Sequence, residues 1–338
     1  MEKIKIPTGY IIVDEYSKGK LETLSIGDYG KSKNIKADFL GYTKELNGVP
    51  NGECISLQEK WVITLSTQYG CPEKCTFCDV PKVGFKGNAT VDDLKQQLFN
   101  AIECFPEVRY TDRLNIHFAR MGEPAYNIGN IYLFCEWLKS QAKQELITKY
   151  NLRIEVIHPV FTTMMPIKIN NNNPHGLEDV LFAWSKDIKY VTFNGQAGLQ
   201  LSINSTNEDQ RKEMYQNRAL SLKEISRITK ELPKPIGRKY CLNFALADGY
   251  ETDGKKLKEL FDPDDWMVKI TPIHNNNSCK ENGIQTVGGY QEFTPYKEAE
   301  ESFKEVGFDV LVFIPSFDEE DGCVTCGNVI LGGSELKV

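Results

Sequence analysis

The sequence predicts an α/β protein: a partial (β/α)6 barrel of the TIM type, preceded by a β-hairpin and followed by a cysteine-bearing tail. After residue 61, short apolar segments alternate with segments of helical periodicity, which is typical of a parallel sheet. The 338 residues exceed the roughly 250 of a single α/β barrel, so one large domain with extra segments fits best. Chemically active residue types follow the ends of predicted strands, where such barrels carry their chemistry.

The part before the barrel favours strands. Tyr10–Asp14 and Leu21–Ile26 flank a polar turn, which predicts a hairpin. Trp61–Ser66 is the first predicted barrel strand and leads directly into a group of cysteines. We expect the hairpin and an insertion over residues 1–60, the barrel over 61–314 and the tail over 315–338.

Within the barrel, strands and helices are expected in turn. The predicted strands are 113–119, 152–158, 198–203, 240–246 and 267–272, and the predicted helices are 91–104, 128–143, 177–185, 221–231 and 253–261. The fourth helix begins with a capping box, Ser221 to Glu224. His117 and His158 lie within apolar strands and are expected to be core side chains.

Composition limits the function classes. The net charge of −7 argues against a general affinity for nucleic acid, whose phosphates require a basic surface. We see neither a bilayer-spanning apolar run nor a secretory signal, so we expect a cytoplasmic protein without a membrane partner. Most of the ten cysteines should then be reduced thiols or ligands. Five that stand alone are expected to be buried apolar side chains: Cys54, Cys104, Cys135, Cys241 and Cys279.

Three of the cysteines have a spacing that predicts a metal cluster. Cys71, Cys75 and Cys78 form a C-x3-C-x2-C loop directly after a predicted strand. Three thiolates on one tight loop can hold three irons of a [4Fe–4S] cluster and leave the fourth open for a reactive ligand. The alternatives are a zinc site or coincidence. A zinc site usually needs a fourth ligand from a second C-x2-C pair, and no matching pair lies nearby.

The motif C-x3-C-x-Phe-C resembles the signature of the radical S-adenosylmethionine (SAM) superfamily, and other segments resemble its RlmN/Cfr group. That group methylates an adenine ring carbon in ribosomal RNA and, for some members, transfer RNA. The resemblance runs from about Tyr10 to Gly332. It implies a [4Fe–4S] cluster that binds and reductively cleaves SAM, an RNA or nucleotide substrate, and an electron donor such as flavodoxin or ferredoxin.

The resemblance also implies a set of SAM-binding residues. Arg120-Met-Gly-Glu-Pro124 is similar to the family's Gly-Met-Gly-Glu-Pro, where Gly122 and Glu123 would receive the SAM amino group. The segment from Leu201 to Asn207 is similar to the one that holds SAM. The remaining members implied in this way are Ser202, Asn204, Thr162, and either His274 or Asn275. Taken alone, these short strings are equally consistent with loops and turns.

Two further matches concern catalysis. Cys326-Gly327 resembles the family's Cys-Gly, whose cysteine is methylated by one SAM and then carries the methylene to the substrate. The segment from Leu21 to Ile26 resembles the one that bears the general base, which makes Glu22 its candidate. Alternatively, Cys323 and Cys326 are a redox pair, a second metal site or simple thiols, and Glu22 is an exposed strand residue.

The chain departs from the family in two ways. The family has a second catalytic cysteine seven positions before the first cluster cysteine, and here that position is Thr64. A hydroxyl cannot form the disulfide that releases the product, so we hypothesise that Cys323 substitutes. The family's N-terminal RNA-binding domain has no counterpart before Tyr10. Other radical chemistry on a nucleotide or small molecule, or non-catalytic iron–sulfur binding, therefore remain alternatives. The sequence predicts no oligomeric state.

Overall fold

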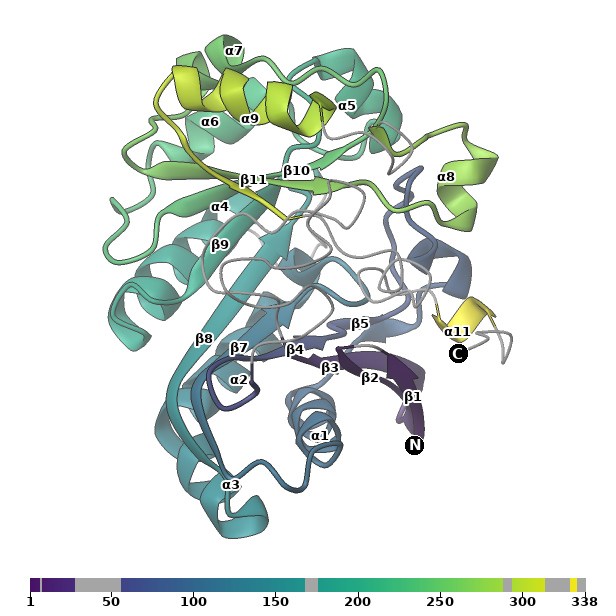
Figure 1. Ribbon diagram of the computed structural model, residues 1–338, viewed down its shortest axis with the longest axis vertical. Coiled ribbons are helices and arrows are strands. Elements are labelled where there is room, and N and C mark those ends of the chain that lie inside the picture. Colours follow the sequence, from purple (N-terminus) through teal and green to yellow (C-terminus); the bar gives the residue numbers. More distant parts are fainter. Residues whose placement is uncertain (7, 28–55, 168–175, 288–293, 314–328, 333–338) are drawn as a thin grey trace.

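The computed structural model describes the whole chain except residues 7, 28–55, 168–175, 288–293, 314–328 and 333–338 (Figure 1). Its described part contains a 10-stranded sheet with the order β1-β2-β3-β4-β7-β8-β9-β10-β11-β12. Those strands are β1 (Glu2–Ile6), β2 (Gly9–Tyr16), β3 (Gly19–Ile26), β4 (Trp61–Leu65), β7 (Tyr110–Phe118), β8 (Arg153–Thr163), β9 (Gly198–Ser202), β10 (Tyr240–Leu246), β11 (Trp266–Pro272) and β12 (Asp309–Val312). A small second sheet pairs β5 (Gln68–Tyr69) with β6 (Gly87–Asn88).

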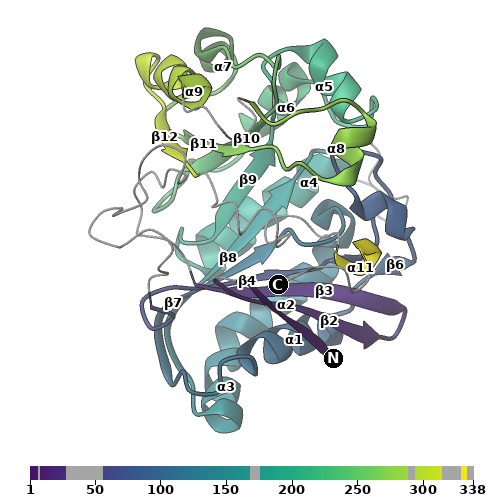
Figure 2. The ribbon, with the colours of Figure 1, turned by 45° about the vertical axis from the view of Figure 1, so that its right-hand side comes forward.

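The N-terminal strands extend the main sheet. β2 and β3 form the predicted antiparallel hairpin, with Val13 opposite Glu22. β3 then pairs antiparallel with β4, so that Leu24 lies opposite Thr64. β1, which the sequence did not predict, adds an outer antiparallel strand to β2. Figure 2 shows the hairpin continuing the sheet from β4.

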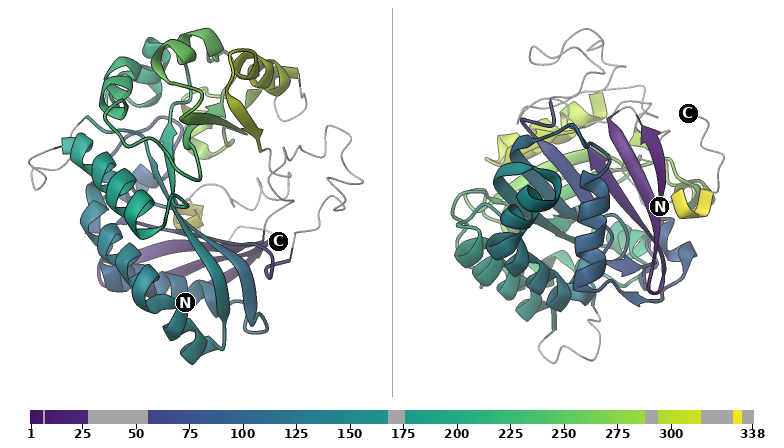
Figure 3. Two further views of the ribbon diagram at one scale, coloured as in Figure 1. Left: turned by 90° about the vertical axis from the view of Figure 1, so that its left-hand side faces the viewer. Right: turned by 90° about the horizontal axis from the view of Figure 1, so that it is seen from below.

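From β4 to β12 the strands are parallel. Each neighbouring pair along this run is parallel, from β4–β7 through β11–β12. The run counts seven described strands, one more than the six predicted, and its last member is β12. Figures 1 and 3 show a curved sheet with helices on its outer side. Among the described strands β1 and β12 remain edges, so the fold is α/β with an open mixed sheet.

The helices follow the predicted order with local differences. They are α1 (Val91–Ile102), α2 (Ile128–Trp137), α3 (Lys143–Tyr150), α4 (Gly176–Phe182), α5 (Glu208–Met214), α6 (Leu222–Thr229), α7 (Gly254–Leu260), α8 (Asn277–Glu281), α9 (Thr294–Glu305) and α11 (Val329–Gly332). The helix predicted over 128–143 continues through a π-helical turn, Leu138–Ala142, into α3. The Ser221–Glu224 capping box at α6 is confirmed, because both reciprocal hydrogen bonds are present. The sequence missed α5, α8 and α9.

The two faces of the sheet differ in polarity. On β4, the side chains of Trp61, Ile63 and Leu65 are fully buried on the helix-covered face. Aromatic rings also pack in this core: Phe161 of β8 stacks on Trp184 with ring centroids 5.0 Å apart. The alternate residues point to the inner face, because successive strand side chains alternate. Thr64 and His117 are neighbours there, and both are only partly buried. No described helix is long and apolar enough to cross a membrane.

Candidate active site

The three loop cysteines lie together at the carboxyl end of β4. Cys71, Cys75 and Cys78 occupy the loop between β5 and the 3-10 helix η2 (Val80–Val83), and each is partly buried. Burial raises the pKa of the Cys78 thiol to about 11. Burial also raises the pKa of Cys71 and Cys75, and proximity to Cys78 raises both further. Such thiols become thiolates only when a cation offsets the buried charge.

This donor set fits an iron–sulfur cluster better than a single ion. In the described part of the chain, no three acidic, cysteine or histidine side chains converge on one metal position. A cubane differs from a single ion because each of its cysteine sulfurs binds a separate iron. Three thiols on one loop are a donor set that suits a cluster. The ligand assignment itself stays a prediction.

The first half of the cysteine loop is held by the segment after β9. The Arg218 guanidinium donates to Glu73 Oε2 at 2.6 Å and to the Pro72 carbonyl at 3.1 Å. Thr76 donates its backbone N–H, at 2.9 Å, to the carbonyl of Met214 at the end of α5. The other Glu73 oxygen accepts from the Tyr126 hydroxyl. The loop is therefore fixed by side chains far from it in sequence.

The second half of the loop is held by α8, which follows β11. The Asn276 amide donates to the Phe77 carbonyl at 2.8 Å, and Asn282 donates to the Thr76 carbonyl at 2.9 Å. Asp79 is buried and accepts from the backbone N–H and hydroxyl of Ser278, at 2.8 and 2.6 Å. This carboxylate connects the residue after Cys78 directly to the start of α8.

Glu123 and Gly122 lie beside the cysteine loop. The Glu123 carboxylate accepts from the backbone N–H of Ala125 at 2.9 Å and of Met164 at 3.0 Å. Burial raises its pKa to about 7, opposed by the Met164 hydrogen bond. Gly122 has φ +91°, and a Cβ there would lie 2.5 Å from Gln68 Cβ. Glycine is thus required for the chain to pass Gln68, whose side chain accepts from Glu123 N–H.

Tyr215 connects the β9 end to the cysteine loop. Its hydroxyl donates to the Ser202 carbonyl at 2.9 Å. Burial raises the pKa of this hydroxyl, and a side-chain hydrogen bond with Asn204 opposes the shift. Its ring meets the Phe77 ring edge-on, with centroids 5.6 Å apart. Asn204 has φ +64° and accepts from the backbone N–H of Ala245 on β10. The structure therefore brings Ser202 and Asn204 to the same region as the loop.

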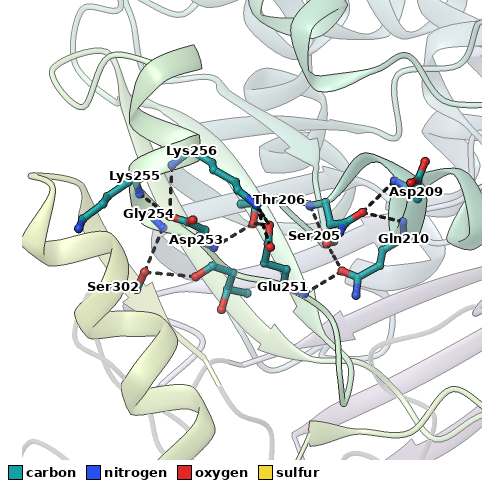
Figure 4. A network of polar contacts seen from close by, with 12 residues as sticks. Ser205, Thr206, Asp209, Gln210, Glu251, Asp253, Gly254, Lys255, Lys256 and Ser302 are labelled. Carbon is teal, nitrogen blue, oxygen red and sulfur yellow. Dashed lines mark hydrogen bonds and ion pairs between the residues drawn. The ribbon is translucent and has the colours of Figure 1, made fainter.

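A polar network fixes the chain immediately after Asn204 (Figure 4). Thr206 donates its hydroxyl to Glu251 at 2.8 Å and accepts from Asp253 N–H at 2.9 Å. Gln210 Oε1 accepts from the Ser205 hydroxyl and from Glu251 N–H. These bonds join the loops after β9 and β10, so the position of Asn204 is held from both strands.

The remaining predicted SAM residues lie on neighbouring strand ends. Thr162, on β8, donates its hydroxyl to Gln200 at 3.3 Å and is partly buried. His274 is partly buried and Asn275 is exposed, in the turn between β11 and α8. Their neighbour Asn276 donates a hydrogen bond to the Phe77 carbonyl of the cysteine loop. The choice between His274 and Asn275 therefore stays open.

Glu22 is near the same end of the sheet but is not an exposed strand residue. Its side chain is fully buried, and Oε2 pairs with Arg120 Nη2 at 2.9 Å and accepts from Arg120 Nε at 3.0 Å. Oε1 accepts from the backbone N–H of Ile330 at 2.7 Å. The alternative of a solvent-facing Glu22 is wrong. Cys323 and Cys326 lie outside the described residues.

Several residues of this region escaped the sequence-based prediction. Glu73, Asp79 and Gln68 support the loop and the Gly122 turn, and Arg120 is the partner of Glu22. Arg218 and Arg120 were noticed only as parts of family-like strings. An acidic residue between the first two cysteines of the loop is the one local signal that could have indicated Glu73.

Comparison with known proteins finds relatives of this chain. The chain is 25% identical, over 232 residues, to the dual-specificity RNA methyltransferase RlmN of Campylobacter hominis. The aligned region covers 68% of this chain and 57% of the relative. The probable RlmN of Pseudothermotoga lettingae is 26% identical over 220 residues, or 63% and 55% of the two chains. This chain is a radical SAM, RlmN-like protein.

The radical SAM fold is seen directly in a solved structure. A radical SAM methyltransferase from Sphaerobacter thermophilus superposes with a TM-score of 0.65 at 15% identity, covering 97% of this chain and 79% of that one. No family model matches the sequence. The chain spans about half the length of the curated RlmN relatives it matches.

Proposed function

We propose that this RlmN-like chain is a radical SAM methyltransferase that modifies an sp2 carbon of an RNA adenine or an adenine-like base. The observation that carries the proposal is the braced loop of three partly buried thiols beside Glu123. A zinc site would require convergent ligands, and a simple core cysteine would not need three thiols on one loop. Similarity to the RlmN relatives supports the methyl transfer and the RNA substrate.

Cys71, Cys75 and Cys78 would hold the [4Fe–4S] cluster, with SAM on its open iron. When bound and reduced, the cluster would supply the electron that cleaves SAM and generates a 5′-deoxyadenosyl radical. The residues of the chain bind and orient. Phe77 and Tyr215 place aromatic surface beside the cysteines, which excludes water from them.

Glu123 is suited to receive the SAM ammonium group. The backbone N–H groups of Ala125 and Met164 and the Thr163 side chain use three of the roughly four acceptor sites of its carboxylate, which leaves one for a ligand. A positive ammonium group nearby would favour the charged carboxylate, against the burial that raises its pKa. The strand-end residues Ser202, Asn204, Thr162 and His274 or Asn275 would complete the SAM site.

The later chemistry rests on the resemblance. Cys326 would be methylated by one SAM, lose a hydrogen atom to the radical and add its methylene to the substrate carbon. A base must then remove a proton from that carbon, and Glu22 remains the predicted candidate. Thr64 cannot resolve the adduct through a disulfide, so Cys323 is proposed for that step. Domain limits of 1–60, 61–314 and 315–338, a cytoplasmic location and a flavodoxin-like or ferredoxin-like donor are proposed with it.

The test combines iron content, SAM cleavage and the fate of the methyl group. Anaerobically reconstituted protein should bind about four irons, release 5′-deoxyadenosine under reduction, and transfer label from methyl-labelled SAM into total RNA. Digestion to nucleosides would then identify a methyladenine. Release of 5′-deoxyadenosine without labelled RNA would favour other radical chemistry, and neither product would favour a non-catalytic iron–sulfur protein.

A matched cysteine pair checks the ligand set. Cys75→Ala should lose the cluster and all SAM cleavage. Cys279→Ala is the control, because Cys279 is a buried cysteine of α8 and lies outside the C-x3-C-x2-C loop. Equal iron loss in both variants would contradict the assignment.

A further inference from the structure

One row of residues on the inner face of the curved sheet (Figure 3) lies close to the candidate SAM residues. His117 of β7 is the register partner of Val160 on β8, and Val160 is the partner of Gly198 on β9. Thr162 lies two positions beyond Val160, which is about 7 Å at the usual rise of a strand. A group bound at this row would therefore be within one nucleotide's length of the candidate SAM residues.

The guanidinium group of Arg238 lies over this row. Leu199 is fully buried and is the register partner of Phe161 on the helix-covered face, so the neighbouring position Gly198 faces inward. A Cβ at Gly198 would meet Arg238 Nη1 at 3.5 Å and the Val160 methyl groups at 3.3 Å. Nη1 is buried, and within the described residues it has no hydrogen-bond partner. The inner face therefore holds a guanidinium group with an unused donor.

The described charges that act on this row are positive. Burial lowers the pKa of the His117 ring to about 3, and three cations add to the shift: Lys269, Arg238 and Lys60. Burial also lowers the pKa of Arg238, and Arg113 adds to that shift. No carboxylate of the described chain is among the groups that shift either pKa. A buried cation without a counter-charge is costly, and a bound anion would remove that cost.

A phosphate group attached to a ribose fits these donors and acceptors. A guanidinium group offers paired N–H donors that match phosphate oxygens, and a neutral imidazole adds one more donor. Asn115 lies two residues before His117 on the same face of β7, and its buried Oδ1 has no partner among the described groups. A ribose hydroxyl can donate to that oxygen. A simple carboxylate ligand would satisfy the cations and leave the Asn115 oxygen without a donor.

We propose that Arg238, His117 and Asn115 form a ribose-phosphate site, which holds one nucleotide of the substrate beside the SAM-binding strand ends. Arg238 binds the phosphate group, and Asn115 accepts a hydrogen bond from the ribose. The choice of a nucleotide as ligand rests on the proposed function. A single well-placed phosphate contact would let a chain of net charge −7 bind RNA without a broad basic surface.

Binding of small ligands to the reconstituted protein tests this site. The probes are tri-adenylate RNA, the same trinucleotide with uncharged methylphosphonate linkages, its DNA counterpart, adenosine monophosphate and adenosine. Isothermal titration calorimetry at several salt concentrations gives the affinities. The variants are Arg238→Met and Asn115→Leu. Arg227→Met is the matched control, because Arg227 is an exposed arginine of α6 that pairs with Glu178.

We expect Arg238→Met to weaken binding of tri-adenylate RNA and of adenosine monophosphate by about tenfold or more. Arg227→Met should leave both affinities unchanged. The slope of log K against log salt for the RNA should decrease in magnitude by about 0.7 in Arg238→Met, the value for one phosphate of a single strand. Asn115→Leu should bind the RNA and DNA trinucleotides equally, because the 2′-hydroxyl loses its acceptor.

Two comparisons keep the test decisive. Arg238→Met should be at least as stable to urea as wild type, because it removes a buried cation without a counter-charge. The comparison of charged with uncharged ligands uses wild type alone, so it stands whether or not a variant folds. Tighter binding of the RNA identifies a phosphodiester as the source of the phosphate, and tighter binding of adenosine monophosphate identifies a terminal phosphate. Either order supports the site.

Three results would overturn the proposal. They are equal affinity of wild type for a charged ligand and its uncharged counterpart, equal RNA affinity of Arg238→Met and wild type, and no binding of either phosphate compound to wild type. Methyl transfer is measured separately. Arg238-dependent phosphate binding without methyl transfer would refute the proposed function and leave the site. Methyl transfer with unchanged RNA affinity in Arg238→Met would refute the site alone.

Discussion

Buried charged groups are the residues on which this molecule most depends. Arg211, Lys189, Arg120 and Glu22 are all nearly or fully buried. Lys189 donates to three backbone carbonyls, and the Arg211 guanidinium does the same around β9 and Leu220. Glu22 and Arg120 differ from these two cations, because they are oppositely charged and form an ion pair with each other. Removing Arg120 leaves the buried Glu22 carboxylate without this counter-charge.

Arg120→Met should therefore be strongly destabilising. The Glu22 carboxylate would remain buried without its counter-charge, which typically costs about 3–5 kcal/mol of unfolding free energy. Urea denaturation at pH 7 measures the loss. Glu22→Gln with Arg120→Met is the control and should be clearly more stable than the single variant, because it buries no lone charge. Equal stability of the two would contradict this account.

His158 should make the fold sensitive to acid. Burial, followed by the nearby Arg238, Arg113 and Lys189, lowers its pKa from 6.5 to about 4. Between those values the unfolded chain binds more protons at this position than the folded chain, so stability falls as pH falls from about 6.5 to about 4. The slope from one such group is at most about 1.4 kcal/mol per pH unit.

The measurement is urea stability at several pH values for wild type and His158→Gln. The substitution should flatten the slope between pH 6.5 and 4, because the proton uptake of the unfolded state at this position disappears. An unchanged slope would show that other groups set the acid sensitivity. Sequence reasoning placed His158 in the core, and its 7% exposure confirms this.

At the scale of elements, the short helix α8 holds the cysteine loop in place through hydrogen bonds. Its first turn is bound by Asp79, and Asn276 and Asn282 at its two ends reach back to loop carbonyls. A helix of five residues is too short to be stable alone, so these contacts keep it folded. The loop and the helix should therefore lose order together.

Asp79→Ala should release α8. The variant loses charge-assisted hydrogen bonds to the Ser278 N–H and hydroxyl, each worth about 1.5–3 kcal/mol. Hydrogen exchange across residues 276–282 should rise by about tenfold or more. Lys82→Met is the control, since the Lys82 bridges to Asp79 and Glu281 are partly exposed and should contribute about 1 kcal/mol or less. Similar exchange rates in both variants would contradict the claim that Asp79 stabilises α8.

Elements with local signals were predictable, and those made by distant contacts were not. The hairpin follows from two apolar runs around a polar turn, and α6 follows from its Ser221–Glu224 capping box. α8 has only an Asn cap in its own sequence, because its stability comes from Asp79, which lies about 199 residues earlier. Likewise, Glu22 was identified by resemblance, but its partners Arg120 and Ile330 lie 98 and 308 residues away.

At the scale of the whole molecule, the proposed cluster should stabilise the fold that surrounds it. A ligand that binds only the folded state raises stability by about 2.7 kcal/mol at a hundredfold excess over its dissociation constant. Reconstitution with iron and sulfide should therefore raise the midpoint of thermal unfolding by at least about 3 °C. Differential scanning calorimetry under anaerobic conditions measures the shift. Cys75→Ala should show no such gain, and an equal gain would indicate iron bound elsewhere.

The distant bracing of the cysteine loop has a consequence for biosynthesis. Asn282 holds the Thr76 carbonyl from 206 positions further along the chain. At about 5–20 residues per second, a ribosome needs roughly 10–40 s to make the polypeptide between them. Throughout that interval the nascent thiols lack their final supports. Productive loading with iron should thus follow completion of the barrel. A metal bound earlier would bind to a cysteine loop that has not yet folded.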